Sequence, residues 1–167
     1  MSNKKKNVLF LCTGNSARSI MAEALLAQLG HEKFNAFSAG SKPKGEIHPK
    51  SIETLNKNNL NTAGFRSKSW DEFTLPDTPE IDIVITVCSN AANESCPVFP
   101  GNPLSTHWDL DDPAREFNSE EEQDREFLKI FKKLQELIQK ITKLDIENSE
   151  RDVLNEDLNE ISTVCQI

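Results

Sequence analysis

A cysteine and an arginine separated by five residues form a pair that can do chemistry on an anion. Cys12 ends an apolar run, and Arg18 lies just before a stretch with helical patterning. In a turn between a strand and a helix, successive backbone N–H groups point inward and the helix N-terminus adds positive potential. Gly14 can give such a turn its unusual backbone angles, and the planar guanidinium of Arg18 suits a tetrahedral oxyanion. We therefore predict that this turn binds the substrate, through Thr13, Gly14, Asn15, Ser16, Ala17, Arg18 and Ser19.

Cys12 is the candidate nucleophile of this turn. The positive field that would hold an anion would also stabilise a thiolate, which is the reactive form of cysteine. The hydroxyl of Ser19, next to Arg18, can donate a hydrogen bond to that thiolate. The alternative is a buried, inert cysteine at a strand end, which for an isolated cysteine is the commoner case. The order of strand, Cys-x5-Arg-Ser and helix favours the anion-binding turn.

The elements that must position this turn are short apolar runs alternating with helical patterns. The apolar runs predict strands over residues 7–12, 34–38, 81–88 and 105–108. Helical patterns follow the first two strands, over residues 20–29 and 49–58. This alternation favours right-handed crossovers between parallel strands. We expect an α/β fold, with a small four-stranded parallel sheet flanked by helices on both faces and a phosphate-binding loop after strand 1.

The C-terminal third of the chain predicts further helices. A long helix is indicated by apolar residues on one face at Phe127, Ile130, Phe131, Leu134, Leu137, Ile138 and Ile141. A weaker helical pattern follows at Leu154, Leu158 and Ile161, among many acidic residues, and indicates either a packed helix or a frayed extension. We expect one domain over residues 1–142 and an acidic extension with this helical pattern over residues 143–167.

Length and charge exclude several classes of function. A chain of 167 residues with 37% apolar residues suits one domain with a real core. The net charge of −8 argues against nucleic acid or an anionic membrane as a partner. Residues 1–108 are nearly neutral, with 11 basic and 10 acidic residues, so an anionic substrate is not repelled there.

The N-terminus and the four cysteines bear on the compartment. The apolar run behind the basic start is too short for a signal-peptide core or a membrane span. Four cysteines without a secretory leader do not suggest a disulfide-stapled extracellular module. We expect a cytoplasmic protein with no membrane partner, working as a monomer.

The segment CTGNSARS resembles the phosphate-binding loop of the low-molecular-weight protein tyrosine phosphatases, and the chain is most similar to arsenate reductases built on that fold. Residues 21–23, 37–40 and 84–114 also match, within a resemblance that covers about residues 7–140. The resemblance implies that Cys12 attacks arsenate, with phosphate and sulfate as substrate analogues. It also implies that Asp112 protonates the departing oxygen. Pro113 favours an extended conformation at Asp112, which helps to aim the carboxylate.

The same resemblance implies a disulfide relay through Cys88 and Cys96, with thioredoxin as the reductant. Cys12 and Cys88 end neighbouring parallel strands, which lie about 4.8 Å apart, so their sulfur atoms can meet. If the segment between Cys88 and Cys96 were helical, the two would stand about 12 Å apart, beyond disulfide reach. The relay therefore requires this segment to unwind or fold back. Reduction by glutathione or glutaredoxin stays open.

Two other functions would use some of the same residues. A tyrosine phosphatase would use the same Cys12, Arg18 and Asp112, but such enzymes usually carry aromatic residues after the Asp-Pro pair, where this chain has Ala114. A non-enzymatic arsenite- or metal-binding thiol protein would not explain the arginine and the aspartate around the thiol.

No metal ion and no cofactor are expected. A zinc site built from Cys88, Cys96 and His107 would lack a fourth ligand and the usual spacing. Some relatives bind a structural potassium ion near the loop with the help of an acidic residue that aligns with Ser69 of this chain. Cys165, near the end of the chain, is interpreted as a spare surface thiol.

Overall fold

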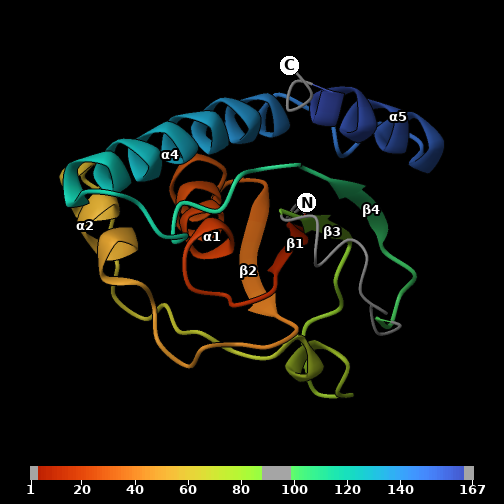
Figure 1. Ribbon diagram of the computed structural model, residues 1–167. Helices are drawn as coiled ribbons and strands as arrows, with labels where there is room; N and C mark the ends of the chain where they lie inside the picture. The colour runs from red at the N-terminus through yellow and green to blue at the C-terminus, as the bar shows by residue number, and fades with distance from the viewer. Residues whose placement is uncertain (1–3, 88–98, 164–167) are drawn as a thin grey trace.

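A four-stranded parallel sheet forms the centre of the computed structural model, which describes residues 4–87 and 99–163 (Figure 1). The strands are β1 (Lys6–Cys12), β2 (Phe34–Gly40), β3 (Ile83–Thr86) and β4 (Leu104–His107). All neighbours are parallel, and the order across the sheet is β2-β1-β3-β4. The predicted α/β class and parallel sheet are confirmed. Cys88, Cys96 and Cys165 lie outside the described residues.

Within the described residues, four α-helices and one short 3-10 helix surround the sheet. They are α1 (Arg18–Leu29), α2 (Pro49–Lys57), α4 (Glu120–Thr142), α5 (Arg151–Ser162) and the 3-10 helix η1 (Trp70–Phe73). Figure 1 shows α1 between the sheet and α4, while the short helix near residue 70 lies at the opposite side of the molecule. No helix of the described residues is long and apolar enough to cross a membrane.

The central strand β1 is buried on both faces, which explains its continuous apolar run. Val8 and Phe10 point into the larger core, together with the buried faces of α1 and α4. Leu9 and Leu11 point to the other face, where they pack in a smaller cluster with Trp70 and other residues. Cys12 ends this strand at the carboxyl edge of the sheet, the edge at which ligands bind in open α/β folds.

The two C-terminal helices bury the apolar faces that their sequence patterns predict. The seven predicted apolar positions of α4 are all buried. On α5, Leu154, Leu158 and Ile161 are buried and belong to the main core. Because α5 contacts both β4 and α4, the helical part of the extension is a packed helix rather than a frayed one. The domain division at residue 142 stays a prediction.

Strand β3 is shorter than the predicted run of residues 81–88. Its ladder with β1 covers only Ile83–Thr86. At its start, the backbone N–H of Asn7 donates to the side chain of Asp82 at 2.8 Å instead of to a backbone carbonyl, while the N–H of Asp82 still donates to the carbonyl of Asn7 at 2.9 Å. At its end, Val87 donates to the carbonyl of Leu11 at 2.8 Å, which keeps the chain beside β1.

Candidate active site

The loop after β1 turns its carbonyl groups outward. The carbonyl oxygens of Cys12, Thr13, Gly14 and Ser16 accept backbone N–H groups from the segment 41–48, at 2.9–3.2 Å. In a trans peptide the C=O and N–H groups point in opposite directions. The N–H groups of these peptide units therefore face the inside of the loop, as an anion-binding turn requires.

Close packing against β2 fixes the position of this loop. A Cβ atom on Gly40, the last residue of β2, would lie 2.4 Å from the carbonyl oxygen of Thr13. Such a contact is far below van der Waals distance, so only glycine fits where the two segments meet. This close contact is the physical reason why the sequence FSAG ends in glycine.

The special backbone angle of the loop belongs to Asn15 and not to Gly14, contrary to our expectation. Asn15 has φ of 46°, in the left-handed region, whereas Gly14 lies outside that region. Asparagine tolerates left-handed angles better than most residues. Here its side chain also makes several buried hydrogen bonds, which hold the residue in that conformation.

The N-terminus of α1 completes the anion-binding turn. Ala17 occupies the N-cap position, and its methyl side chain cannot accept a hydrogen bond from the first turn. The first backbone N–H groups of a helix have no partner within the helix, and they carry the positive end of its dipole. Because Ala17 and Arg18 line the cavity over Cys12, this end of the helix lies beside the place where an oxyanion would bind.

A cavity of about 220 Å³ opens over Cys12. Its lining brings together most of the predicted site residues with two lysines that the sequence reasoning missed. The lining residues are Cys12, Thr13, Gly14, Ser16, Ala17, Arg18, Lys42, Lys44, Asp112 and Ala114. Asn15 and Ser19, which were also predicted to bind substrate, are buried and contact Cys12. The cavity therefore presents three cationic side chains and one carboxylate around a thiol.

Arg18 is anchored by the segment that follows β4. Its guanidinium donates a hydrogen bond to the carbonyl of Leu110 at 2.9 Å, and its second terminal nitrogen lies 3.8 Å from Oδ1 of Asp112. The same Oδ1 atom accepts the backbone N–H of Ala114 at 2.9 Å. These contacts hold the predicted acid and the predicted anion-binding arginine side by side at one cavity.

Two groups of the loop contact the sulfur of Cys12, which is 3% exposed. The hydroxyl of Ser19 lies 2.9 Å from Sγ, and the backbone N–H of Asn15 donates to Sγ at 3.1 Å. Hydrogen bonds donated to a sulfur stabilise its anionic form more than its neutral form. The predicted role of Ser19 therefore has the geometry that it needs.

The missed lysines lie where a topological argument could have found them. Lys42 and Lys44 follow the carboxyl end of β2, which neighbours β1, so they lie at the same sheet edge as Cys12. The backbone N–H of Lys44 donates to the carbonyl of Gly14 at 3.0 Å. The signal in the sequence is a pair of basic residues directly after the second strand of a parallel sheet.

The structure does not test the predicted relay. Cys88 and Cys96 lie outside the described residues. Within residues 4–87 and 99–163, no three His, Cys, Asp or Glu side chains come together as a metal site would require.

Comparison with known proteins places this site in a family. A family model described as low molecular weight phosphotyrosine protein phosphatase matches residues 7–153. The chain belongs to this family. The resemblance noted in the sequence is therefore confirmed, and the family explains the combination of a parallel sheet with an anion-binding loop after its first strand.

Within the family, the chain is similar to proteins named arsenate reductases. The arsenate reductase of Staphylococcus xylosus is 36% identical over 126 residues, which cover 75% of this chain and 92% of the relative. Arsenate reductase 2 of Staphylococcus saprophyticus is 40% identical over 110 residues, which cover 66% of this chain and 80% of the relative.

Solved structures of the same fold include both reductases and phosphatases. An arsenate reductase in its phosphate-binding state matches with a TM-score of 0.62 and 25% identity, over 82% of this chain and 96% of that chain. A thioredoxin-dependent arsenate reductase of Corynebacterium glutamicum matches with a TM-score of 0.55 and 26% identity, over 83% and 64%. The tyrosine phosphatase Wzb of Escherichia coli K30, at 20% identity and a TM-score of 0.66 over 84% and 98%, shares the fold.

Proposed function

We propose that this protein reduces arsenate to arsenite, with Cys12 as the nucleophile. The observation that carries the proposal is the single cavity that holds the Cys12 sulfur, the Arg18 guanidinium and the Asp112 carboxyl group. The similarity to arsenate reductases, at 36% and 40% identity, selects arsenate among the tetrahedral oxyanions that such a cavity can accept.

The first step is the attack of Cys12 on arsenate. Inward N–H groups and Arg18 bind the oxygen atoms of the anion and neutralise its charge. The thiolate forms a bond to arsenic while one oxygen departs as water, with the proton supplied by Asp112. The product of this step is a thioester of arsenic(V) on Cys12, and no change of oxidation state has yet occurred.

The second step reduces arsenic. The thiolate of Cys88 attacks the Cys12 sulfur, and the electron pair of the sulfur–arsenic bond stays with arsenic, which leaves as arsenite. The two cysteines become a disulfide, so two thiols are oxidised for each arsenic reduced. Support comes from the hydrogen bond between Val87 and Leu11, which places the residues just before Cys88 and Cys12 side by side.

The third step is a thiol–disulfide exchange that moves the disulfide from Cys12–Cys88 to Cys88–Cys96. Cys96 attacks Cys88, which frees the Cys12 thiolate and leaves a Cys88–Cys96 disulfide for thioredoxin to reduce. We propose that thioredoxin is the reductant, and that the protein works as a monomer in the cytoplasm. A thioredoxin-dependent arsenate reductase among the structural relatives supports this choice of reductant.

The test is arsenate-dependent turnover with thioredoxin, thioredoxin reductase and NADPH. We expect serine at Cys12, Cys88 or Cys96 to abolish multiple turnover, because each thiol takes part in the relay. Cys165→Ser is the matched control and should keep the wild-type rate. If Cys96→Ser keeps full turnover, the third step is wrong, and reduction by glutathione or glutaredoxin replaces it.

A second candidate function, phosphatase activity on an aryl phosphate, is favoured by the same loop and cavity. Among the residues that line the cavity, Ala114 follows the Asp-Pro pair, and an alanine offers no ring to stack on a phenol. We expect weak hydrolysis of an aryl phosphate beside faster arsenate reduction. If the aryl phosphate is turned over faster than arsenate, each at a saturating concentration, phosphatase activity is the main function.

A further inference from the structure

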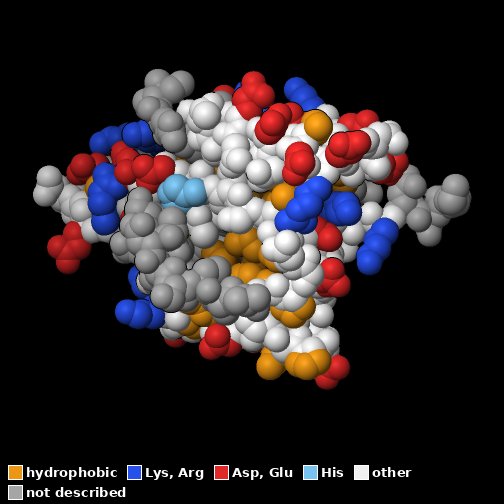
Figure 2. Space-filling model, turned by 90° about the vertical axis from the view of Figure 1, so that its right-hand side faces the viewer, with side chains coloured by type: hydrophobic (Ala, Val, Ile, Leu, Met, Phe, Trp, Pro, Cys, Tyr) orange, Lys and Arg blue, Asp and Glu red, His pale blue; other side chains and the backbone are white. Residues whose placement is uncertain are grey.

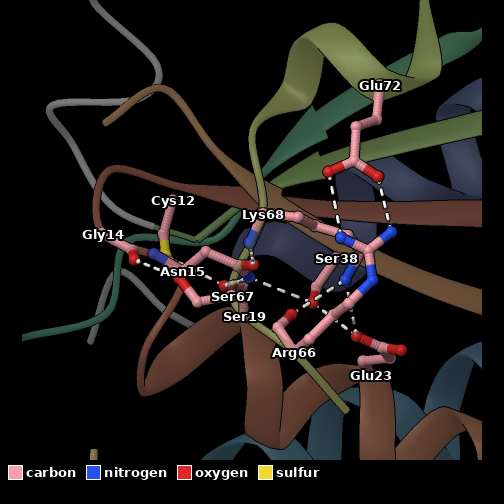
Figure 3. Close-up of polar contacts among 10 residues, drawn as sticks. All are labelled: Cys12, Gly14, Asn15, Ser19, Glu23, Ser38, Arg66, Ser67, Lys68 and Glu72. Atoms are coloured by element: carbon pink, nitrogen blue, oxygen red, sulfur yellow. Dashed lines mark hydrogen bonds and ion pairs between the residues drawn. The ribbon is translucent and has the colours of Figure 1, made fainter. Parts of the chain in front are cut away.

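A buried lysine, Lys68, lies next to the anion-binding loop (Figure 3) and does not line the cavity. The side chain of Lys68 is 8% exposed, and its ammonium lies 3.9 Å from Oε1 of Glu23, which is 12% exposed. The ammonium also donates to the carbonyl of Arg66 at 3.1 Å. A buried charge is costly unless it is paired and hydrogen-bonded, so this arrangement needs a reason.

A chain of hydrogen bonds connects this ion pair to the nucleophile. The hydroxyl of Ser38 donates to Oε1 of Glu23. The side-chain amide of Asn15 contacts Ser38 Oγ at 3.0 Å and Ser19 Oγ at 2.8 Å. The hydroxyl of Ser19 in turn contacts the sulfur of Cys12 at 2.9 Å. Figure 3 shows these side chains in one group between β1, β2 and α1.

The chemistry of the groups fixes the direction of each hydrogen bond. The backbone N–H of Lys68 donates to Oδ1 of Asn15 at 2.8 Å, so the NH₂ group of Asn15 faces the two hydroxyls. A carboxylate only accepts, so Ser38 gives its proton to Glu23 and accepts from Asn15. Ser19 also accepts from Asn15. The single proton of Ser19 is then left to donate to the Cys12 sulfur.

We propose that Lys68 is a positioning residue for the nucleophile. The Lys68 ammonium holds the Glu23 carboxylate, and the Lys68 backbone N–H holds the Asn15 amide. Together these contacts orient Ser19 so that it donates to the Cys12 thiolate. The proposal rests on Cys12 as the nucleophile of the proposed function. Lys68 does not line the cavity and acts only through Glu23, Asn15 and the two serines.

The charges around the pair agree with this role. Burial raises the pKa of Glu23, and Lys68 opposes that effect most strongly, followed by the hydrogen bond from Ser38 and by Arg66. Burial also lowers the pKa of Lys68, while Glu23 opposes that change. Arg66 is itself paired with Glu72, so Lys68 is the cation that most strongly opposes the rise in the pKa of Glu23.

The experiment measures the reactivity of Cys12 without arsenate. In the reduced full-length chain, iodoacetamide labels Cys12 at a rate that follows its thiolate fraction, and peptide mass spectrometry quantifies the label across a range of pH. We expect Lys68→Met to move the midpoint of this profile upward and to slow labelling about three- to tenfold near pH 6, which corresponds to about half to one unit in thiol pKa. Lys57→Met, which removes an exposed lysine paired with Glu53, is the matched control and should leave the profile unchanged.

The charged groups that line the cavity around Cys12 are the same in all these variants. They are Arg18, Lys42, Lys44 and Asp112. A shift in the labelling profile therefore reports on the hydrogen-bonded chain behind the loop. Because labelling needs neither arsenate nor thioredoxin, its result is independent of whether arsenate is the substrate.

A double-mutant cycle separates positioning from simple loss of stability. Ser38→Ala breaks the chain with both charges in place, so it should slow labelling by itself, and adding Lys68→Met should give little further loss. Glu23→Gln should restore labelling in the Lys68→Met background, because the amide oxygen still accepts from Ser38 and no unpaired charge is buried. An unchanged profile in Lys68→Met, or independent additive losses in the double variant, would overturn the proposal. If Lys68→Met alone does not fold, the Ser38→Ala profile decides, and a profile like that of the wild type refutes the role.

Discussion

Around the sulfur of Cys12, the cavity gathers three cationic side chains and one carboxylate. Arg18 is largely buried and held by Leu110, whereas Lys42 and Lys44 are exposed at the rim. A buried planar guanidinium fixes the orientation of an oxyanion, while exposed ammonium groups mainly raise its local concentration. The arginine and the lysines should therefore have different kinetic signatures.

Lys44→Met should raise the KM for arsenate about two- to fivefold and leave kcat nearly unchanged. Exposed charge interactions are worth about 0.2–1 kcal/mol, and the upper part of that range, from about 0.4 kcal/mol, corresponds to this change in KM. The effect should shrink at high ionic strength, because salt screens exposed charges. Steady-state kinetics at low and high salt, with Lys57→Met as the control, check the prediction. A large fall in kcat would instead place Lys44 in the chemical step.

Single residues show where sequence reasoning reaches its limit. Local motifs identify the residues Cys12, Arg18 and Asp112, because the Cys-x5-Arg loop and the Asp-Pro pair are each formed by residues close together in the sequence. Lys68 lies 53 positions from its hydrogen-bond partner Asn15, so only the folded chain brings the two together. The left-handed angle was expected at Gly14 and occurs at Asn15, because buried hydrogen bonds override the general preference for glycine.

Among the elements, α2 begins beside the anion-binding loop and is capped by a titratable side chain. Nδ1 of His48 accepts the backbone N–H of Lys50 at 3.1 Å, and the backbone N–H of His48 donates to the carbonyl of Ser16 at 3.0 Å. An Nδ1 atom that accepts this bond cannot carry a proton. Protonation of His48 would therefore break the cap at the point where α2 meets the loop.

His48 should make the protein less stable in mild acid. Burial, followed by the charges of Lys44 and Lys50, lowers the pKa of His48 below its ordinary value of 6.5. Because the unfolded chain takes up this proton first, the contribution is present above pH 6.5 and is lost as the pH falls from there through the lowered pKa. His48→Asn keeps a capping side chain and should flatten the pH dependence. Urea unfolding of the wild type and the variant near pH 7 and pH 5.5 measures the free energy of unfolding at each pH, with His31→Asn as the control. If His48→Asn loses as much stability between the two pH values as the wild type, the prediction is wrong.

The helix α5 shows what a weak periodic pattern leaves undecided. Three apolar positions among acidic residues predicted a helix, but their burial depends on a surface that β4 and α4 provide. The strand pattern over residues 81–88 had the opposite difficulty. A continuous apolar run indicates burial, yet a hydrogen bond from Asn7 to Asp82 starts the ladder two residues later than the pattern suggests.

Leu158→Ala should cost about 2–5 kcal/mol, because Leu158 is 1% exposed and its truncation leaves a cavity in the core. For a chain of this size the melting temperature should fall by roughly 5–15 °C. Val153→Ala, on the same helix with 47% exposure, is the matched control and should change little. Equal effects of the two substitutions in thermal unfolding would contradict a packed α5.

Over the whole molecule, charge and chemistry occupy different regions. The acidic excess belongs to residues 109–167, with 17 acidic and 8 basic residues, and the exposed acids Asp152, Glu156 and Glu160 lie on α5. Figure 2 shows acidic side chains gathered along the edge where α5 lies. The cavity opens at the carboxyl edge of the sheet, where three cations surround Cys12. The net charge of the chain is therefore a poor guide to the charge that its substrate carries.

In the proposed reduction, the electron pair of the bond between Cys12 sulfur and arsenic stays with arsenic when Cys88 attacks Cys12. The most direct test is one turnover of arsenate by the Cys96→Ser variant, followed by peptide mass spectrometry without reduction. We predict one Cys12–Cys88 disulfide and two lost thiols for each arsenite released. Arsenite release at that stoichiometry without a crosslink between positions 12 and 88 would contradict the account.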